Sequence, residues 1–168
     1  MDKGNLFFIG FMGVGKSTIA RMVAKEINAR LIEMDETIEA EEGSSINEIF
    51  AAKGEEYFRD LETALIERIS EQEGMVVSCG GGAVLRPQNL ELMKKSGKII
   101  YLSATPETIF RRVRYSNNRP LLRDNMNVEY ITQLMERRIG IYEQAADVII
   151  VTDDKNKPEI LAEVLEIQ

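Results

Sequence analysis

Short apolar runs alternate with amphipathic segments along the whole chain. Runs of four or five mostly apolar residues predict strands over 6–9, 30–34, 75–79, 99–102 and 148–151, of which 6–9 and 75–79 are expected to be buried. Between and after these runs, apolar residues recur every three or four positions, which predicts helices over 18–28, 36–41, 55–72, 87–95, 128–144 and 157–167. Strands that alternate with helices in this way predict a parallel sheet in an α/β fold.

Capping residues mark two further helix starts. Ser45 and Glu48 form a capping box that starts a helix, and Gly54 interrupts that helix soon afterwards. Thr105 followed by Pro106 predicts another start after the fourth strand, because proline is favoured in the first turn.

Composition narrows the possible functions. The 168 residues suffice for one domain with a full core, and the net charge of -7 argues against a general nucleic-acid or membrane-surface binder. The absence of histidine excludes histidine acid–base chemistry, the Ser-His-Asp triad and the usual histidine-containing zinc sites. A single cysteine, Cys79, and the lack of a run long enough to span a bilayer predict a cytoplasmic protein.

The first apolar run leads into a phosphate-binding motif. Residues 10–17, Gly-Phe-Met-Gly-Val-Gly-Lys-Ser, fit G-x-x-x-x-G-K-[ST] at every fixed position, between a predicted strand and a predicted helix. Successive backbone N–H groups and the positive end of the helix dipole make this an anion site. Lys16 is expected to reach the outer phosphates of a nucleotide, and Ser17 to ligate Mg²⁺. The nucleotide contacts expected here are Gly13, Val14, Gly15, Lys16, Ser17 and Thr18.

Two acidic residues end the second predicted strand. Glu33 and Asp35 are two positions apart, so on a strand they share a face at the carboxyl end, where ligands bind in α/β sheets. Alternatively, Asp35 caps the helix that begins at Glu36. No Asp follows the strand of 75–79, so the usual Walker B carboxylate is absent, and Glu33 and Asp35 are the best candidates to stand near a metal.

Three consecutive glycines, residues 80–82, directly follow the strand of 75–79. Their small size lets a ligand approach the backbone closely at the edge of the sheet, although a loose turn also uses such a run.

Two arginines are ambiguous from spacing alone. Arg59 lies beside the apolar stripe of its helix and is either solvated or turned toward a site. Arg138 is spaced with Met135 and Tyr142 so that it falls on the apolar face of a helix over 128–144. It is therefore either paired or facing a cleft, or its long side chain carries the charge out to water.

The segment 111–123 concentrates positive charge in an acidic chain. It carries five arginines and no acid, around the turn-rich sequence Ser-Asn-Asn-Arg-Pro. A mobile arginine-bearing loop that closes over phosphates fits phosphoryl transfer, because arginine stabilises the transferring group and closure excludes water. A solvated charge run or an RNA-binding patch is the alternative. The arginines are Arg111, Arg112, Arg114, Arg119 and Arg123.

Taken in order, these motifs resemble those of the shikimate kinase family. The segments that carry the resemblance are 10–18, 34–39, 54–62, 80–82, 119–122 and 138–142. The resemblance implies a P-loop NTPase fold of the nucleoside-monophosphate-kinase type, a three-layer α/β/α arrangement with a five-stranded parallel sheet in the order 2-3-1-4-5. It also implies one domain over 1–168, with a helical substrate-binding segment over 35–62 and a mobile lid over 112–126.

The reaction implied by the resemblance is transfer of the ATP γ-phosphate to the 3-hydroxyl of shikimate, with Mg²⁺, in aromatic amino-acid biosynthesis. The implied partners are shikimate and ATP, without nucleic acid or membrane, and the family is usually monomeric. The positions that match the family's shikimate contacts are Asp35, Arg59, Gly80, Gly81, Gly82 and Arg138.

The same resemblance distributes the remaining roles. Arg119 belongs to the lid and contacts the nucleotide phosphates, and Arg112, or Arg114 in a different alignment, lies on the adenine side. Lys16, Asp35 and Arg119 are the expected catalytic residues, and Ser17 and Glu33 the expected metal residues. Without histidine, Asp35 is the one plausible proton acceptor.

Two positions depart from the family pattern. Glu33 stands where the family usually has Asp, which affects the expected metal geometry, and Gly140 stands where many members have Pro, which should loosen the helix. The rival functions are another small-metabolite kinase of this fold, acting on gluconate or a nucleotide, and a nucleotide-binding regulator.

Overall fold

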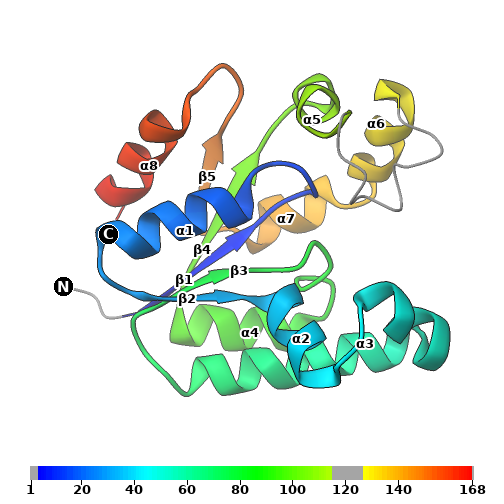
Figure 1. The fold of residues 1–168 in the computed structure, drawn as a ribbon. Helices are drawn as coiled ribbons and strands as arrows, with labels where there is room; N and C mark the ends of the chain where they lie inside the picture. The colour runs from blue at the N-terminus through cyan, green and yellow to red at the C-terminus, as the bar shows by residue number, and fades with distance from the viewer. Residues whose placement is uncertain (1–3, 115–126, 168) are drawn as a thin grey trace.

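Five parallel strands form the centre of the molecule (Figure 1). The structure is a computed structural model that describes residues 4–114 and 127–167. The strands pair in the order β2-β3-β1-β4-β5, which confirms the predicted fold and strand order. They are β1 (Asn5–Ile9), β2 (Arg30–Glu33), β3 (Met75–Ser78), β4 (Gly97–Ser103) and β5 (Val148–Val151).

Helices cover both faces of this sheet. Figure 1 shows α1 and α8 side by side over one face, and α3 and α4 below the other. Every residue of β1 and β3 is therefore buried, which explains why these strands are apolar except for Asn5 and Ser78 at their ends. The helices are α1 (Lys16–Glu26), α2 (Met34–Glu42), α3 (Ile46–Ser70), α4 (Pro87–Ser96), α5 (Pro106–Val113), α6 (Val128–Glu136), α7 (Ile139–Ala145) and α8 (Lys157–Glu166).

The parallel direction of the strands fixes where a site can form. All carboxyl ends lie at one edge of the sheet, where β1 leads into α1 and β2 into α2. Tight turns at these ends bring backbone and side chains from separate segments together, as ligand sites in open α/β sheets require.

The second strand is shorter than predicted. It ends at Glu33, and Met34 and Asp35 already belong to the first turn of α2, so the prediction that Glu33 and Asp35 share a strand face is wrong. The alternative that Asp35 caps this helix is also wrong, because the residue at the cap position is Glu33. Met34 is completely buried, and this position can be buried in a helix as well as in a strand.

The helix predicted over 128–144 is two helices. Arg138 has φ -123° and ψ -22°, and its N–H bonds to the carbonyl of Met135, so the chain turns between α6 and α7. Met135 and Tyr142 are buried as the spacing predicts, because the turn keeps both on the core side. The apolar period thus correctly predicted that Met135 and Tyr142 are buried, but wrongly predicted one continuous helix. Gly140 lies in the first turn after the break.

Smaller differences concern helix ends. The helix predicted over 18–28 begins at Lys16 and ends at Glu26, and Ile27, which lies inside the predicted range, is exposed. The predicted interruption at Gly54 is confirmed, since this residue has φ 86° and ψ 171° inside α3. No helix within the described part of the chain combines the length and hydrophobicity needed to cross a bilayer.

Candidate active site

The phosphate loop is held open by left-handed glycines. Gly13 and Gly15 have φ of 81° and 104°, a region that side chains with a Cβ avoid, and a Cβ on Gly13 would collide with the side chain of Val113. The Nζ of Lys16 donates to the carbonyls of Gly10 at 2.7 Å and Phe11 at 3.2 Å, so the ammonium lies within the loop. Gly15 precedes α1 without a side-chain cap, and no acid occupies its first turn. A helix start without a side-chain cap and a nearby ammonium make this a site for phosphate.

Ser17 and Glu33 meet beside this loop. Ser17 Oγ donates to Glu33 Oε2 at 2.8 Å, and the other carboxylate oxygen of Glu33 lies 3.3 Å from Arg21. The hydroxyl of Ser78, the last residue of β3, is 3.3 Å from that of Ser17. Glu33 and Ser78 are register partners across β2 and β3, which explains why they converge.

These oxygens suit a hard cation. Mg²⁺ prefers oxygen ligands, keeps several waters and binds together with substrate phosphates. Within residues 4–114 and 127–167 no three His, Cys, Asp or Glu side chains gather into a group that could hold a metal ion. A metal held by one protein hydroxyl and one carboxylate would need phosphate and water as its further ligands. Ser78 was missed from the sequence because only the strand register places it there.

A second group of side chains surrounds the glycine loop, residues 80–85. Backbone bonds from Ala83 to Gly80 and from Leu85 to Gly82 fold this loop into two successive turns. A Cβ on Gly80 would lie 2.9 Å from both Asp35 Oδ1 and a carboxylate oxygen of Glu62. Glycine is needed there because two acids, one from α2 and one from α3, approach the loop backbone.

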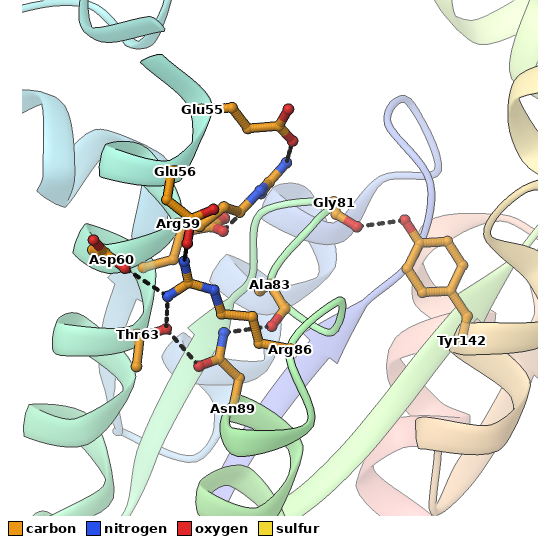
Figure 2. Close-up of polar contacts among 11 residues, drawn as sticks. Glu55, Glu56, Arg59, Asp60, Thr63, Gly81, Ala83, Arg86, Asn89 and Tyr142 are labelled. Carbon is orange, nitrogen blue, oxygen red and sulfur yellow. Dashed lines mark hydrogen bonds and ion pairs between the residues drawn. The ribbon is translucent and has the colours of Figure 1, made fainter. Parts of the chain in front are cut away.

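Arg59 is not a solvated arginine. Its guanidinium binds Glu62 at 2.7 Å and Glu55 at 3.3 Å, and its side chain is 13% exposed. A Cβ on Gly82 would lie 2.6 Å from the Arg59 Cζ, so the guanidinium occupies the space that this glycine leaves. Figure 2 shows Arg59 reaching from α3 toward Glu55 beside the glycine loop. The reading of Arg59 as an exposed charge is therefore wrong.

Glu62 is the most buried charge in this group. Its side chain is 1% exposed, and one of its oxygens has no hydrogen-bond partner among the described residues, nor does the Nε of Arg59. Burial raises the pKa of Glu62 above its ordinary value, although the neighbouring Arg59 opposes that shift. Buried polar atoms without partners are rare and mark a place where a polar ligand can bind. The i,i+3 spacing of Arg59 and Glu62 on one helix was the signal that could have found Glu62.

Arg138 and Tyr142 close the group from α7. A Cβ on Gly81 would lie 3.1 Å from a guanidinium nitrogen of Arg138, and Tyr142 donates its hydroxyl to the Gly81 carbonyl at 2.7 Å (Figure 2). The guanidinium of Arg138 therefore lies against the glycine loop. The structure thus brings Arg59 and Arg138 to adjacent glycines of one loop.

Arg112 lies on the far side of the phosphate loop. Its guanidinium donates to the carbonyl of Val14 at 3.0 Å and to the hydroxyl and carbonyl of Thr152, each at 3.1 Å. This arginine therefore joins the phosphate loop to the segment after β5. A cavity of about 240 Å³ opens beside it, large enough for part of a planar base. It is lined by Thr108, Arg111, Arg112, Asp154 and Lys155.

Asp153 fixes the wall of this cavity. Its carboxylate accepts from the N–H and hydroxyl of Thr105 and from the hydroxyl of Thr108, at the start of α5. Burial raises the pKa of Asp153, but these hydrogen bonds outweigh that effect and hold it below its ordinary value. Arg114 ends α5 at its C-terminal cap, whereas Arg119 and most of the predicted lid lie outside the described residues.

Comparison with known proteins places these features in a family. Residues 12–168 match the family model described as shikimate kinase. A shikimate kinase from Persephonella marina is 42% identical over 161 residues, which cover 96% of each chain. The solved structure of a shikimate kinase from Acinetobacter baumannii in complex with shikimate has a TM-score of 0.89 at 29% identity, covering 98% of this chain and 92% of that one. A gluconokinase from Sinorhizobium meliloti, at 18% identity and a TM-score of 0.61 with 98% and 90% coverage, shares the fold alone.

Proposed function

The chain belongs to the shikimate kinase family and so transfers the γ-phosphate of ATP to the 3-hydroxyl of shikimate, and we propose that its phosphate loop holds the donor while Arg59, Arg138 and Asp35 hold the acceptor. The products are ADP and shikimate 3-phosphate, within aromatic amino-acid biosynthesis. The observation that supports the division of roles is that an acid and two arginines from three separate helical segments converge on consecutive glycines.

The donor is held chiefly by backbone and by one ammonium. The N–H groups of 13–18 bind the β- and γ-phosphates, where α1 offers uncapped donors. Lys16 exchanges its two carbonyl partners for phosphate oxygens and neutralises charge that spreads over the transferring group. This charge neutralisation makes Lys16 catalytic as well as nucleotide-binding.

Ser17 would hold Mg²⁺ by its hydroxyl and Glu33 would hold it through the water shell. The ion would supply positive charge that offsets the charge of the phosphates. Glu33 is one methylene longer than the Asp usual in the family, yet its carboxylate already reaches Ser17 at 2.8 Å. The Ser78 hydroxyl stands close enough to orient a water of that shell.

The acceptor site matches the chemistry of shikimate, a carboxylate with three hydroxyls. Arg59 and Arg138 present planar donor groups that suit a carboxylate, and the loop glycines 80–82 give the ring room against the backbone. Asp35 accepts the proton of the 3-hydroxyl and orients its oxygen toward the γ-phosphate. Because the transition state of phosphoryl transfer is loose, positioning contributes more than base strength.

The base of the nucleotide lies in the cavity beside Arg112, between α5 and the segment after β5. Arg119, from the lid outside the described residues, reaches the phosphates when the site closes. Arg114, at the end of α5, is the alternative to Arg112 on the adenine side.

The protein acts as a cytoplasmic monomer with shikimate and ATP as its partners, and without nucleic acid or membrane. The net charge of -7 supports the absence of nucleic-acid and membrane partners, because phosphate-rich surfaces repel an acidic chain.

The direct test is ADP formation from ATP and Mg²⁺ with and without shikimate, with Lys16→Ala as the control. Shikimate-dependent ADP formation in the natural chain that disappears in the variant is the expected result. Turnover with gluconate or a nucleotide in place of shikimate would overturn the assignment, and omission of Mg²⁺ should abolish activity.

A further inference from the structure

A chain of hydrogen bonds, buried except at Arg86, links α3 and α4 to the glycine loop (Figure 2). Arg86, at the cap of α4, donates to the hydroxyl of Thr63 at 3.2 Å. Thr63 donates to the side-chain oxygen of Asn89 at 2.8 Å, and the amide nitrogen of Asn89 donates to the carbonyl of Ala83 at 2.8 Å. We call the Arg86–Thr63–Asn89–Ala83 chain the relay.

The chemistry of these groups gives the relay one direction. A guanidinium has donors only, so the Thr63 hydroxyl accepts from Arg86 and gives its single proton to Asn89. That proton holds the amide oxygen of Asn89 toward α3, and the amide nitrogen must then face Ala83. Arg86 is itself fixed by Glu56 at 2.9 Å and Asp60 at 2.8 Å, both on α3.

The relay occupies space that apolar side chains could fill. Asn89 is 1% and Thr63 is 7% exposed, and burying such groups is costly unless every polar atom is satisfied. Here the polar side chains hold one carbonyl of the glycine loop, whereas apolar side chains in their place would only pack α3 against α4. A polar network of this kind specifies a position at some cost in burial energy.

The loop is held on its other side as well. Tyr142 donates to the carbonyl of Gly81, two residues before Ala83, so hydrogen bonds from α7 and from α4 hold the loop at two points. Between these anchors lies Gly82, whose missing side chain leaves the space for the guanidinium of Arg59. Movement of Ala83 would therefore change the position of the loop relative to Arg59.

We propose that Asn89 is a positioning residue for shikimate binding. Its amide holds the Ala83 carbonyl, and thereby keeps the glycine loop where the Arg59 guanidinium fits beside Gly82. Thr63 and Arg86 set the orientation of that amide. This inference rests on the proposed assignment of the glycine loop and Arg59 to the shikimate site.

The first test is Asn89→Asp, assayed at mildly alkaline pH, because a carboxylate has the size of the amide but no donor for the Ala83 carbonyl. The KM for shikimate should rise by about tenfold, a change that corresponds to the free energy of one well-placed hydrogen bond. The KM for ATP should stay unchanged. Gln88→Glu is the matched control, since this neighbouring amide bonds Glu67 outside the relay and should keep both KM values. An unchanged KM for shikimate in Asn89→Asp, or an equal rise in Gln88→Glu, would overturn the proposal.

The split between KM and kcat separates positioning from a loss of folded protein. A smaller folded fraction lowers the apparent kcat and leaves KM alone, so a purely structural role of Asn89 would not move KM for shikimate. If Asn89→Asp does not fold, Thr63→Val decides, because it removes the relay hydroxyl at nearly constant volume. It should raise KM for shikimate by about three- to tenfold, and Thr63→Ser should restore the natural value. Equal KM values for all three proteins would reject the relay.

The variant Gly82→Ala distinguishes a failure of the proposed shikimate site from a failure of the relay. If the loop and Arg59 bind shikimate, the added Cβ displaces the guanidinium and raises KM for shikimate whether or not the relay matters. If Gly82→Ala leaves KM for shikimate unchanged, the assigned site is wrong. If Gly82→Ala raises KM and Asn89→Asp does not, only the relay is wrong.

Discussion

The two halves of the site are built in different ways. The donor half is centred on one continuous stretch, residues 10–18, whose backbone conformation supplies most of the phosphate-binding groups. The acceptor half combines side chains from α2, α3 and the start of α7 with a loop after β3. Local sequence determines the first half, and tertiary packing determines the second.

The two halves also differ in backbone conformation and in buried charge. Around the donor, left-handed glycines and a helix start without a side-chain cap provide the backbone that binds phosphate. Around the acceptor, the Arg59–Glu62 pair is buried with polar atoms left over, and glycines yield space to side chains. A site made of backbone groups tolerates few substitutions at the residues that fix its backbone conformation. A site made of side chains depends on every helix and loop that carries one of those side chains.

The largest effect should come from removing the ammonium of the donor half. Lys16→Ala should lower kcat by about 10³-fold, because the charge on the transferring phosphoryl group loses a preorganised partner. Steady-state kinetics with saturating shikimate measure this, and the exposed Lys25→Ala on the same helix is the matched control. A loss of less than about tenfold would remove Lys16 from the catalytic role.

Asp35→Asn should have the next largest effect, a loss of at least about 10²-fold in kcat, as the amide cannot accept the hydroxyl proton. Glu36→Gln, the same change at the neighbouring exposed position, should leave kcat unchanged. Near-normal turnover of Asp35→Asn would mean that the acceptor half supplies position and no proton acceptor.

The amino end of the sheet provides a test of stability apart from function. A Cβ on Gly97 would lie 2.6 Å from the carbonyl carbon of Asn5 and 2.7 Å from its nitrogen. Gly97→Ala should therefore lower the free energy of unfolding by about 1–3 kcal/mol, as overpacking does, and leave both KM values alone.

Gly140→Ala is the matched substitution in open space. No atom lies within 4 Å of the added Cβ, so this variant should gain about 0.5–1 kcal/mol from better helix propensity. Urea denaturation of both variants measures the pair. Equal stability changes would show that the packing around Gly97 is not as tight as described.

The smallest expected effect concerns Asp153, beside the nucleotide cavity. Its pKa is lowered in the folded protein, so its contribution to stability is present above the unfolded pKa of about 4 and is lost as pH falls through the folded value. Asp153→Asn should be less stable than the natural chain at neutral pH, and the difference should shrink in acid. Urea denaturation at several pH values measures this, and a difference independent of pH would exclude the carboxylate charge as its source.

How far the sequence predicts the molecule follows the same division. The five strands, the interruption at Gly54 and the meeting of Ser17 with Glu33 follow from local patterns, because each depends on neighbouring residues or on the common edge of a parallel sheet. The shared strand face predicted for Glu33 and Asp35 is wrong, because the helix begins at the buried Met34, and the assignment of Asp35 to shikimate rests on the family resemblance.

The buried charges could not be predicted in the same way. Spacing alone leaves Arg59 either solvated or turned toward a site and does not single out Glu62, because nothing local shows that the two face a glycine loop. The break at Arg138 likewise depends on where Gly81 and Tyr142 lie, which only the folded chain determines.

The most direct measurement is isothermal titration of one protein, Arg59→Lys, with shikimate and with Mg-ADP. Lysine keeps the positive charge beside Glu62 but loses the planar donor pair that fits a carboxylate. The separation of donor and acceptor halves predicts shikimate affinity weakened by about tenfold or more and ADP affinity equal to that of the natural chain. Equal weakening of both ligands, or natural affinity for shikimate, would contradict it.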